Sequence, residues 1–245
     1  MSALAAIYRR EVASYFATPL AYVFIVIFLL LAGAFSFQLG GLYERGQADL
    51  APFFTFLPWL YLFLVPAIAM RLWAEERRSG SIELLLTLPV RLGAAVAAKF
   101  LAAWSFVALA LALTFPLWIT VNYLGSPDNG AILAAYLGGL LMAGGFLAVG
   151  SCLSAATRSQ VIAFILTVVS CFLLLLAGYP LVLDAFHGWA PDAVVEAVAS
   201  LSFLTHFQAI SKGVLDLRDL AFFLLAIGTW LYATTLVLEL RKADQ

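Results

Sequence analysis

The residues whose types could do chemistry are concentrated in two segments, residues 71–91 and residues 184–219. The first sets Glu75 and Glu76 among arginines, which is typical of a charged helical extension. The second contains His206, which can form structural hydrogen bonds or take part in a gate. The sequence contains no G-x-x-x-x-G-K-[ST] phosphate-binding loop, and its two cysteines lie in apolar runs that suit packing. We therefore predict no catalytic residue and no metal site in this chain.

The composition indicates that the membrane is the solvent of this protein. Of its 245 residues, 64% are hydrophobic and 11% are charged, whereas soluble domains have about 25% charged residues. The mean hydropathy is +1.04, and the formal net charge is −1. These values exclude a disordered chain, a nucleic-acid-binding protein and a secreted disulfide scaffold.

Six apolar runs are long enough to cross a bilayer as helices, because a hydrocarbon core of roughly 30 Å needs about 20 helical residues. Lys99, near one end of the third run, is the only charged residue within them. The runs are residues 20–42, 52–70, 94–124, 131–156, 161–183 and 220–238. We expect an all-α, polytopic membrane protein with six transmembrane helices in a single domain, residues 1–245.

The basic residues indicate the orientation, because lysine and arginine in short flanks favour the cytoplasmic side. With a cytoplasmic N-terminus, only Arg45, Lys212 and Arg218 of the 13 basic residues lie outside. The residues that then lie inside are Arg9, Arg10, Arg71, Arg77, Arg78, Arg91, Lys99, Arg158, Arg241 and Lys242. We therefore predict that both termini are cytoplasmic.

Residues 1–19 predict an amphipathic helix that lies on the inner leaflet and ends before Pro19. Its apolar stripe consists of Leu4, Ile7, Tyr8, Val12, Tyr15 and Phe16. Glu11 points into the middle of this stripe, where an unpaired carboxylate is costly. Two interpretations remain open: either the helix lies high enough for Glu11 to reach water, or Glu11 pairs with a base from residues 71–91.

Residues 71–91 predict two short cytoplasmic helices. The first is a charged extension of the second span and ends at Gly80, which can also cap the second helix. In the second helix, Glu83 complements the helix dipole and Pro89 stops the helix. Its apolar residues, on much of its circumference, are Ile82, Leu84, Leu85, Leu86 and Leu88. Such a helix needs two surfaces: the membrane domain and, most simply, a groove on a cytosolic partner, unless it only tucks under the bundle.

Three segments resemble one known family. The acidic residues, Ser-Gly, Glu83, paired leucines and Thr-x-Pro between Glu75 and Pro89 resemble the coupling helix of ABC-2 type permeases, the membrane subunits of ATP-binding-cassette transporters. Residues 10–22 resemble the family's elbow helix. Residues 203–219 resemble the block before the last span in its gliding-motility-associated and nitrous-oxide-accessory subgroup.

The resemblance implies a permease of the bacterial inner membrane, most simply an exporter, that is not itself an enzyme and binds no cofactor. Its implied partners are two ABC ATPase subunits that bind ATP and Mg, a second permease copy or homologue, membrane lipid and an accessory periplasmic or envelope protein, but no nucleic acid. The residues expected at the ATPase-coupling contact are Glu75, Glu76, Gly80, Glu83, Leu85, Leu86 and Pro89.

Residues 184–219 predict two short helices at the outer interface, one opened by Pro191 and one that begins near Phe203 and is closed by Gly213. The resemblance implies that they dip back into the membrane as a lid. The residues expected at this outer gate or partner contact are His206, Phe207, Lys212 and Asp216. The alternative for His206 is a hydrogen bond within the hairpin.

Two alternative functions remain open. The subunit could transmit ATPase-driven motion to an envelope partner through residues 184–219. A rhomboid-like intramembrane serine protease is a distant alternative, because Gly150-Ser151 and His206 superficially fit such a site. The predicted topology places Ser151 and His206 at opposite faces, too far apart for the contact of about 3 Å that a Ser-His pair needs. Since no acidic residue lies in mid-span, lipidic or amphipathic cargo fits better than ions.

Overall fold

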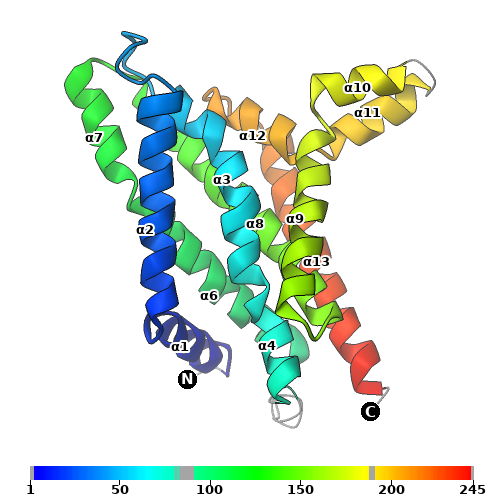
Figure 1. Cartoon of the computed structure of the whole chain (residues 1–245). Coiled ribbons are helices and arrows are strands. Elements are labelled where there is room, and N and C mark those ends of the chain that lie inside the picture. The colour runs from blue at the N-terminus through cyan, green and yellow to red at the C-terminus, as the bar shows by residue number, and fades with distance from the viewer. Residues whose placement is uncertain (1–2, 81, 83–90, 188–190, 244–245) are drawn as a thin grey trace.

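The computed structural model of the chain describes residues 3–80, 82, 91–187 and 191–243, and these residues form helices and loops without any strand (Figure 1). The predicted all-α class is confirmed. The helices are α1 (Ala3–Phe16), α2 (Pro19–Ala34) with a π-helical end (Phe35–Leu39), α3 (Ala51–Ala69), α4 (Arg71–Ser79), α6 (Leu92–Ala112), α7 (Phe115–Leu124), α8 (Asn129–Ala156), α9 (Gln160–Leu176), α10 (Pro180–His187), α11 (Asp192–Ser200), α12 (Phe203–Ser211) and α13 (Leu217–Ala243).

Among the described residues, five helical segments are long and apolar enough to cross a membrane: α2 with its π-helical end, α3 with α4, α6 with α7, α8, and α13. The sixth apolar helix, α9, has 17 residues and is shorter than the others. The run predicted to extend to residue 183 therefore ends at Leu176. A new helix begins at Pro180, because proline lacks the N–H group that continues a helix and restricts the residue before it.

The third predicted span is divided near its outer end. The α6 helix ends at Ala112, and α7 begins at Phe115, directly before Pro116. The hydroxyl of Thr114, at the break, donates a hydrogen bond to the carbonyl oxygen of Leu111 at 2.6 Å. The same oxygen also accepts from the backbone N–H of Thr114 at 3.1 Å, so the last turn of the interrupted helix is closed by two bonds.

Helix α8 forms the centre of the molecule and contacts α3, α6, α9, α12 and α13. Its small residues permit this close packing. A Cβ atom on Gly150 would meet Ala69 of α3 and Thr167 of α9, and one on Gly145 would meet the ring of Phe203. The glycines of this helix therefore serve close helix packing.

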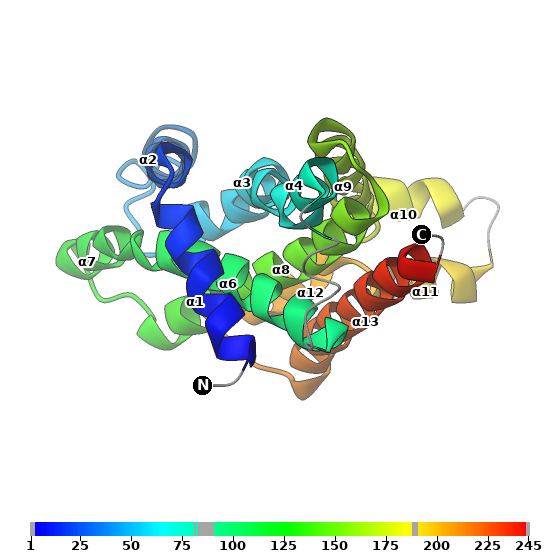
Figure 2. The same cartoon turned by 90° about the horizontal axis from the view of Figure 1, so that it is seen from below.

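The ends of the helices form two groups (Figure 1). One end carries both termini, α1, α4 and the start of α6. The other carries the loop between α2 and α3, the end of α7, and helices α10 to α12. Seen from below, α1 crosses α6 and α4 lies between α3 and α9 (Figure 2). The elements that carry the ten basic residues assigned to the cytoplasm all meet at the first end.

Candidate functional site

The candidate site is the junction where α4 continues α3 beyond Met70. Ser154 of α8 accepts hydrogen bonds from the backbone N–H groups of Trp73 and Ala74, at 3.1 and 3.0 Å, and donates one to the carbonyl oxygen of Met70 at 2.9 Å. Ser151 accepts a hydrogen bond from the indole N–H of Trp73 at 3.0 Å, and the Trp73 side chain is fully buried. These bonds fix the first turn of α4 to α8.

A buried ammonium group lies beside α4. The side chain of Lys99 in α6 is 4% exposed, and its Nζ lies 2.8 Å from Glu76 Oε1 and 3.4 Å from Glu11 Oε1. It also donates a hydrogen bond to the carbonyl oxygen of Leu72 at 3.2 Å and lies 5.2 Å from the ring centre of Trp73. Because Glu11 belongs to α1 and Glu76 to α4, Lys99 joins three helices.

Arg10 completes this group, which we call the Lys99 cluster (Arg10, Glu11, Glu76 and Lys99). Its Nη2 atom lies 2.8 Å from Glu11 Oε1 and 3.7 Å from Glu76 Oε1. The hydrogen bond to Glu11 raises the pKa of the Arg10 guanidinium above its ordinary value. Two carboxylates and two bases leave the cluster without formal net charge, which lowers the electrostatic cost of placing it between helices.

The structure supports pairing of Glu11 but changes the expected partner. The bases are Arg10 and Lys99, whereas the segment after the second span contributes an acid, Glu76. From the sequence, Lys99 stood out only as a lone charge in an apolar run. Such a charge is itself a signal of a buried partner, because an unpaired ion in that position is costly.

The other predicted coupling residues lie partly within the described structure. Glu75 forms an ion pair with Arg71, one helical turn away, at 3.0 Å. Gly80 ends α4 with a φ of +74°, a left-handed conformation that favours glycine, so the predicted end of the charged extension is confirmed. Of the helix predicted over residues 81–88, the structure describes only Ile82, which is buried. Four of the predicted coupling residues lie outside the described part of the chain: Glu83, Leu85, Leu86 and Pro89.

Two arginines bind the C-terminal end of α8 at the same end of the molecule. Arg77 of α4 donates a hydrogen bond to the carbonyl oxygen of Ala155 at 2.6 Å, and Arg241 of α13 donates one to that of Ala156 at 2.8 Å. The last carbonyl groups of a helix lack partners and carry the negative end of its dipole, so guanidinium groups stabilise them. Helices α4 and α13 are therefore anchored to the same helix end.

The two predicted outer helices are present as α11, which follows Pro191, and α12, which is followed by Gly213 with a φ of +86°. Helix α10 precedes them and was not predicted, because its apolar residues continue the pattern of the fifth span. In Figure 1, α10 and α11 project from the bundle, whereas α12 runs along the first part of α8, with Phe203 near Gly145 and Gly213 near Ala131.

His206 of α12 is buried, and both of its ring nitrogens have partners. Nδ1 lies 2.6 Å from Asp219 Oδ1 of α13, and Nε2 lies 3.0 Å from the carbonyl oxygen of Ser200 in α11. A carbonyl oxygen only accepts, so Nε2 donates the hydrogen bond to Ser200. The expected hydrogen bond within the hairpin is confirmed, and the bond to Asp219 ties the hairpin to the last helix.

The other predicted outer residues, Phe207, Lys212 and Asp216, lie in α12 or shortly after it. Phe207 is buried and faces α8 near Gly138. Lys212 is exposed directly after α12. Asp216 accepts a hydrogen bond from the backbone N–H of Arg218 at 2.9 Å, at the start of α13. These three residues therefore have separate structural settings.

The pair required by the serine protease alternative is not assembled. The Ser151 hydroxyl bonds to the Trp73 indole, and the His206 ring bonds to Asp219 and Ser200. Each residue thus serves a different helix junction.

Comparison with known proteins agrees with this architecture. No curated protein matches the chain. Residues 40–234 match the family described as ABC-2 family transporter protein, a match that covers most of the 245 residues and includes the α3–α4 junction and the outer helices. The match does not reach the level of the gliding-motility-associated or nitrous-oxide-accessory subgroup. The chain therefore belongs to the ABC-2 transporter family and is a multi-pass membrane permease component of an ABC transporter.

Proposed function

We propose that this permease is one half of an exporter in the bacterial inner membrane and that two cytosolic ABC ATPase subunits drive it. A second permease copy or a homologue forms the other half. ATP and Mg bind to the ATPases, and the segment 81–88 contacts them, with Glu83 as its cap and Leu85 and Leu86 in an ATPase groove. The observation that supports this proposal most directly is the anchoring of α4, the helix that leads into this segment.

A displacement at the end of α4 would reach several helices at once. Ser154 and Ser151 fix the start of α4 to α8, and Lys99 links it to α1 and α6. Arg77 binds the end of α8. Hydrogen-bonded and ion-paired helices transmit motion as packed bodies rather than absorbing it locally, so closure of the ATPases can change the arrangement of the spans.

Six crossings with both termini in the cytoplasm fit the arrangement of the helices. Helix α9 has 17 residues, which lies at the lower limit of the length that crosses a bilayer. The end that carries both termini also carries most of the lysine and arginine residues, as the cytoplasmic side does in membrane proteins. In this orientation α1 lies on the inner leaflet as an elbow helix, and α11 and α12 lie at the outer interface.

The cargo that fits best is lipidic or amphipathic. Ion and proton pathways place acidic groups within the membrane, and the apolar runs of this chain contain none.

Addition of negative charge to residues 81–88, which we call the coupling segment, tests the proposal. The double change Leu85→Glu and Leu86→Glu places two carboxylates in the expected apolar groove. When the variant is co-expressed with an ABC ATPase that co-purifies with the unaltered chain, we expect this co-purification to be lost, because buried unpaired charges oppose association. Ala13→Glu with Ser14→Glu is the matched control, because it adds the same charge to exposed positions of α1 at the same end of the molecule. ATPase binding that survives in the Leu85/Leu86 variant would contradict the assignment.

Transmission of motion to an envelope partner is the second candidate function. The observation in its favour is the projection of α10 and α11 from the bundle, where Leu181 and Leu201 are exposed (Figure 1). Transport by the complex in liposomes without an envelope protein supports the exporter. ATPase stimulation only when the envelope partner is added supports the transmitter.

A further inference from the structure

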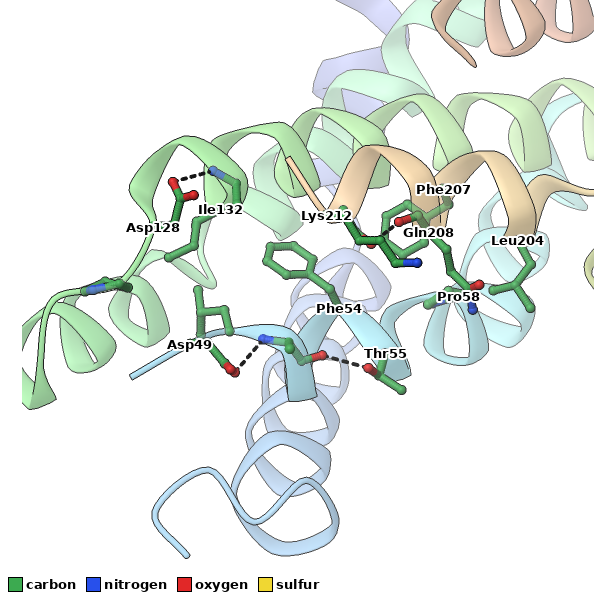
Figure 3. Close-up of a pocket in the computed structure, with 15 residues that line it drawn as sticks. Asp49, Phe54, Thr55, Pro58, Asp128, Ile132, Leu204, Phe207, Gln208 and Lys212 are labelled. Atoms are coloured by element: carbon green, nitrogen blue, oxygen red, sulfur yellow. Dashed lines mark hydrogen bonds between the residues drawn. The ribbon is translucent and has the colours of Figure 1, made fainter. Parts of the chain in front are cut away.

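A pocket of about 470 Å³ lies at the outer end of the bundle, between the start of α3, the start of α8 and helix α12 (Figure 3). Its volume is in the range of small-molecule binding sites. The pocket is also amphipathic. Its apolar lining consists of the buried residues Leu50, Phe54, Pro58, Ile132, Leu204 and Phe207.

The polar rim of the pocket offers more hydrogen-bond acceptors than donors. Asp49 Oδ1 accepts from the N–H of Ala51 at 3.1 Å, and Asp128 Oδ1 accepts from the N–H groups that open α8 at 2.9 and 3.1 Å. These bonds use one oxygen of each carboxylate and leave Oδ2 for a ligand. The hydroxyl groups of Thr55 and Ser211 donate to carbonyl oxygens of their own helices, so they face the ligand as acceptors.

The donors of the pocket are on α12. Lys212 and Gln208 are exposed residues of its lining, and Figure 3 shows both on the wall opposite Asp49. The position of Lys212 is set by Gly213, whose φ of +86° ends the helix and whose Cβ, if present, would lie 3.2 Å from Ala131 Cβ. The pocket therefore presents carboxylates and an ammonium group from different walls.

We propose that this pocket binds the headgroup of a zwitterionic phospholipid that carries a primary ammonium group, such as phosphatidylethanolamine. The ammonium group of the ligand pairs with Asp49 and Asp128, and its phosphate group pairs with Lys212 and Gln208. The parts of the acyl chains nearest the headgroup cover the apolar lining of the pocket. A quaternary ammonium has no N–H group to donate, so an acceptor-rich rim favours a primary ammonium over the choline headgroup.

The location of the pocket favours a lipid over a soluble molecule of the same charge. The pocket lies where α3 and α8 begin, two helices that are long and apolar enough to cross a membrane. From this position we infer that it lies at the level at which headgroups meet acyl chains. The volume accommodates a headgroup, and the remaining acyl chains extend beyond the pocket along the helices. The site requires neither an ATPase nor a particular cargo, so failure of the proposed function would leave it intact.

Native mass spectrometry of the purified, delipidated full-length chain in detergent tests the site. Phosphatidylethanolamine, phosphatidylcholine and phosphatidylglycerol with identical acyl chains are titrated as probes. We expect phosphatidylethanolamine to bind about tenfold more tightly than either of the others, because charge-assisted hydrogen bonds contribute on that scale. Equal binding of the three lipids would overturn the proposal.

Two sets of variants test separately how the ammonium and the phosphate of the headgroup contribute to binding. The double change Asp49→Asn and Asp128→Asn keeps the amide-accepting caps and removes the charge. It should lower the affinity for phosphatidylethanolamine about tenfold, to the level of phosphatidylcholine. Lys212→Gln should weaken both lipids by a similar factor, because both carry the phosphate. A double variant that retains its lipid preference would contradict the assignment.

The matched controls remove charges of the same sign from residues outside the pocket. Asp184→Asn and Arg218→Gln, both at exposed positions of the outer end, should leave lipid binding unchanged. Soluble phosphoethanolamine, added at the concentration of the lipid, should not displace it. Displacement by phosphoethanolamine would show a site for a soluble ligand and would overturn the lipid assignment.

Discussion

The Lys99 cluster contains three charged side chains, from three helices, that have little access to water, together with Arg10, which is 59% exposed. The exposed fractions are 4% for Lys99, 16% for Glu11 and 17% for Glu76. Attraction between such ions is strong, but each ion has lost most of its hydration, so the pairing adds less net stability than the distances suggest. We infer that the cluster fixes the relative positions of α1, α4 and α6.

Removal of the ammonium group alone should be strongly destabilising. Lys99→Met leaves two carboxylates close together without their central partner, and we expect the free energy of unfolding to fall by about 3 kcal/mol. The measurement is the Tm of the purified chain in detergent. Lys242→Met, at an exposed position of α13, is the matched control and should leave the Tm unchanged.

A second change distinguishes charge from packing at this position. Addition of Glu76→Gln to Lys99→Met removes one of the two carboxylate charges and should restore part of the lost Tm. If Lys99→Met has the Tm of the unaltered chain, Arg10 and water are sufficient partners for both carboxylates, and the proposed linkage of three helices is wrong.

At the scale of helices, the small residues of α8 determine how closely its neighbours approach. The Cα of Gly150 faces Ala69 and Thr167, which belong to two different helices. Ser154, one turn later, forms the hydrogen bonds that hold α4. One face of α8 therefore sets both the packing of α3 and the position of α4.

A larger side chain at Gly150, where α8 packs against α3 and α9, should destabilise the bundle. Gly150→Val inserts methyl groups between α8, α3 and α9, and we expect a loss of about 1–3 kcal/mol because overpacked helices must separate. Gly228→Val is the matched control, since a Cβ at Gly228 meets no atom within 4 Å. The Tm in detergent reports both changes. An equal response of the two variants would show that helix propensity rather than packing decides the result.

At the scale of the whole molecule, the two groups of helix ends define which surfaces share a side of the membrane. Arg45 lies in the loop between α2 and α3, and Lys242 lies at the opposite end of the molecule (Figure 1). Both residues are exposed, so each is suitable for chemical labelling.

Single cysteines at these positions should be labelled from opposite sides. In a background with Cys152→Ala and Cys171→Ala, we expect a membrane-impermeant maleimide to label Arg45→Cys in intact spheroplasts and Lys242→Cys only after lysis. Labelling of both cysteines after lysis serves as the control. The reverse pattern would place α4 and the coupling segment outside and would exclude contact with a cytosolic ATPase.

The sequence alone determined the features that depend on local order and composition. The all-helical class, the membrane as solvent, the end of α4 at Gly80 and the start of α12 at Phe203 follow from hydropathy, periodicity and stop signals within short windows. The boundary of α9 and the presence of α10 did not, because one apolar run can form either one helix or two.

Only the tertiary structure decided which distant residues meet. The sequence left Glu11 either in contact with water or paired with a base from residues 71–91. In the structure it pairs with Arg10 of its own helix and, because α1 crosses α6, with Lys99. Trp73 and Ser154 form a hydrogen bond although they are 81 residues apart in the chain, and His206 bonds to Asp219 on another helix. The physical reason is that hydropathy places each helix in the membrane independently, whereas buried polar groups find their partners only when the helices pack together.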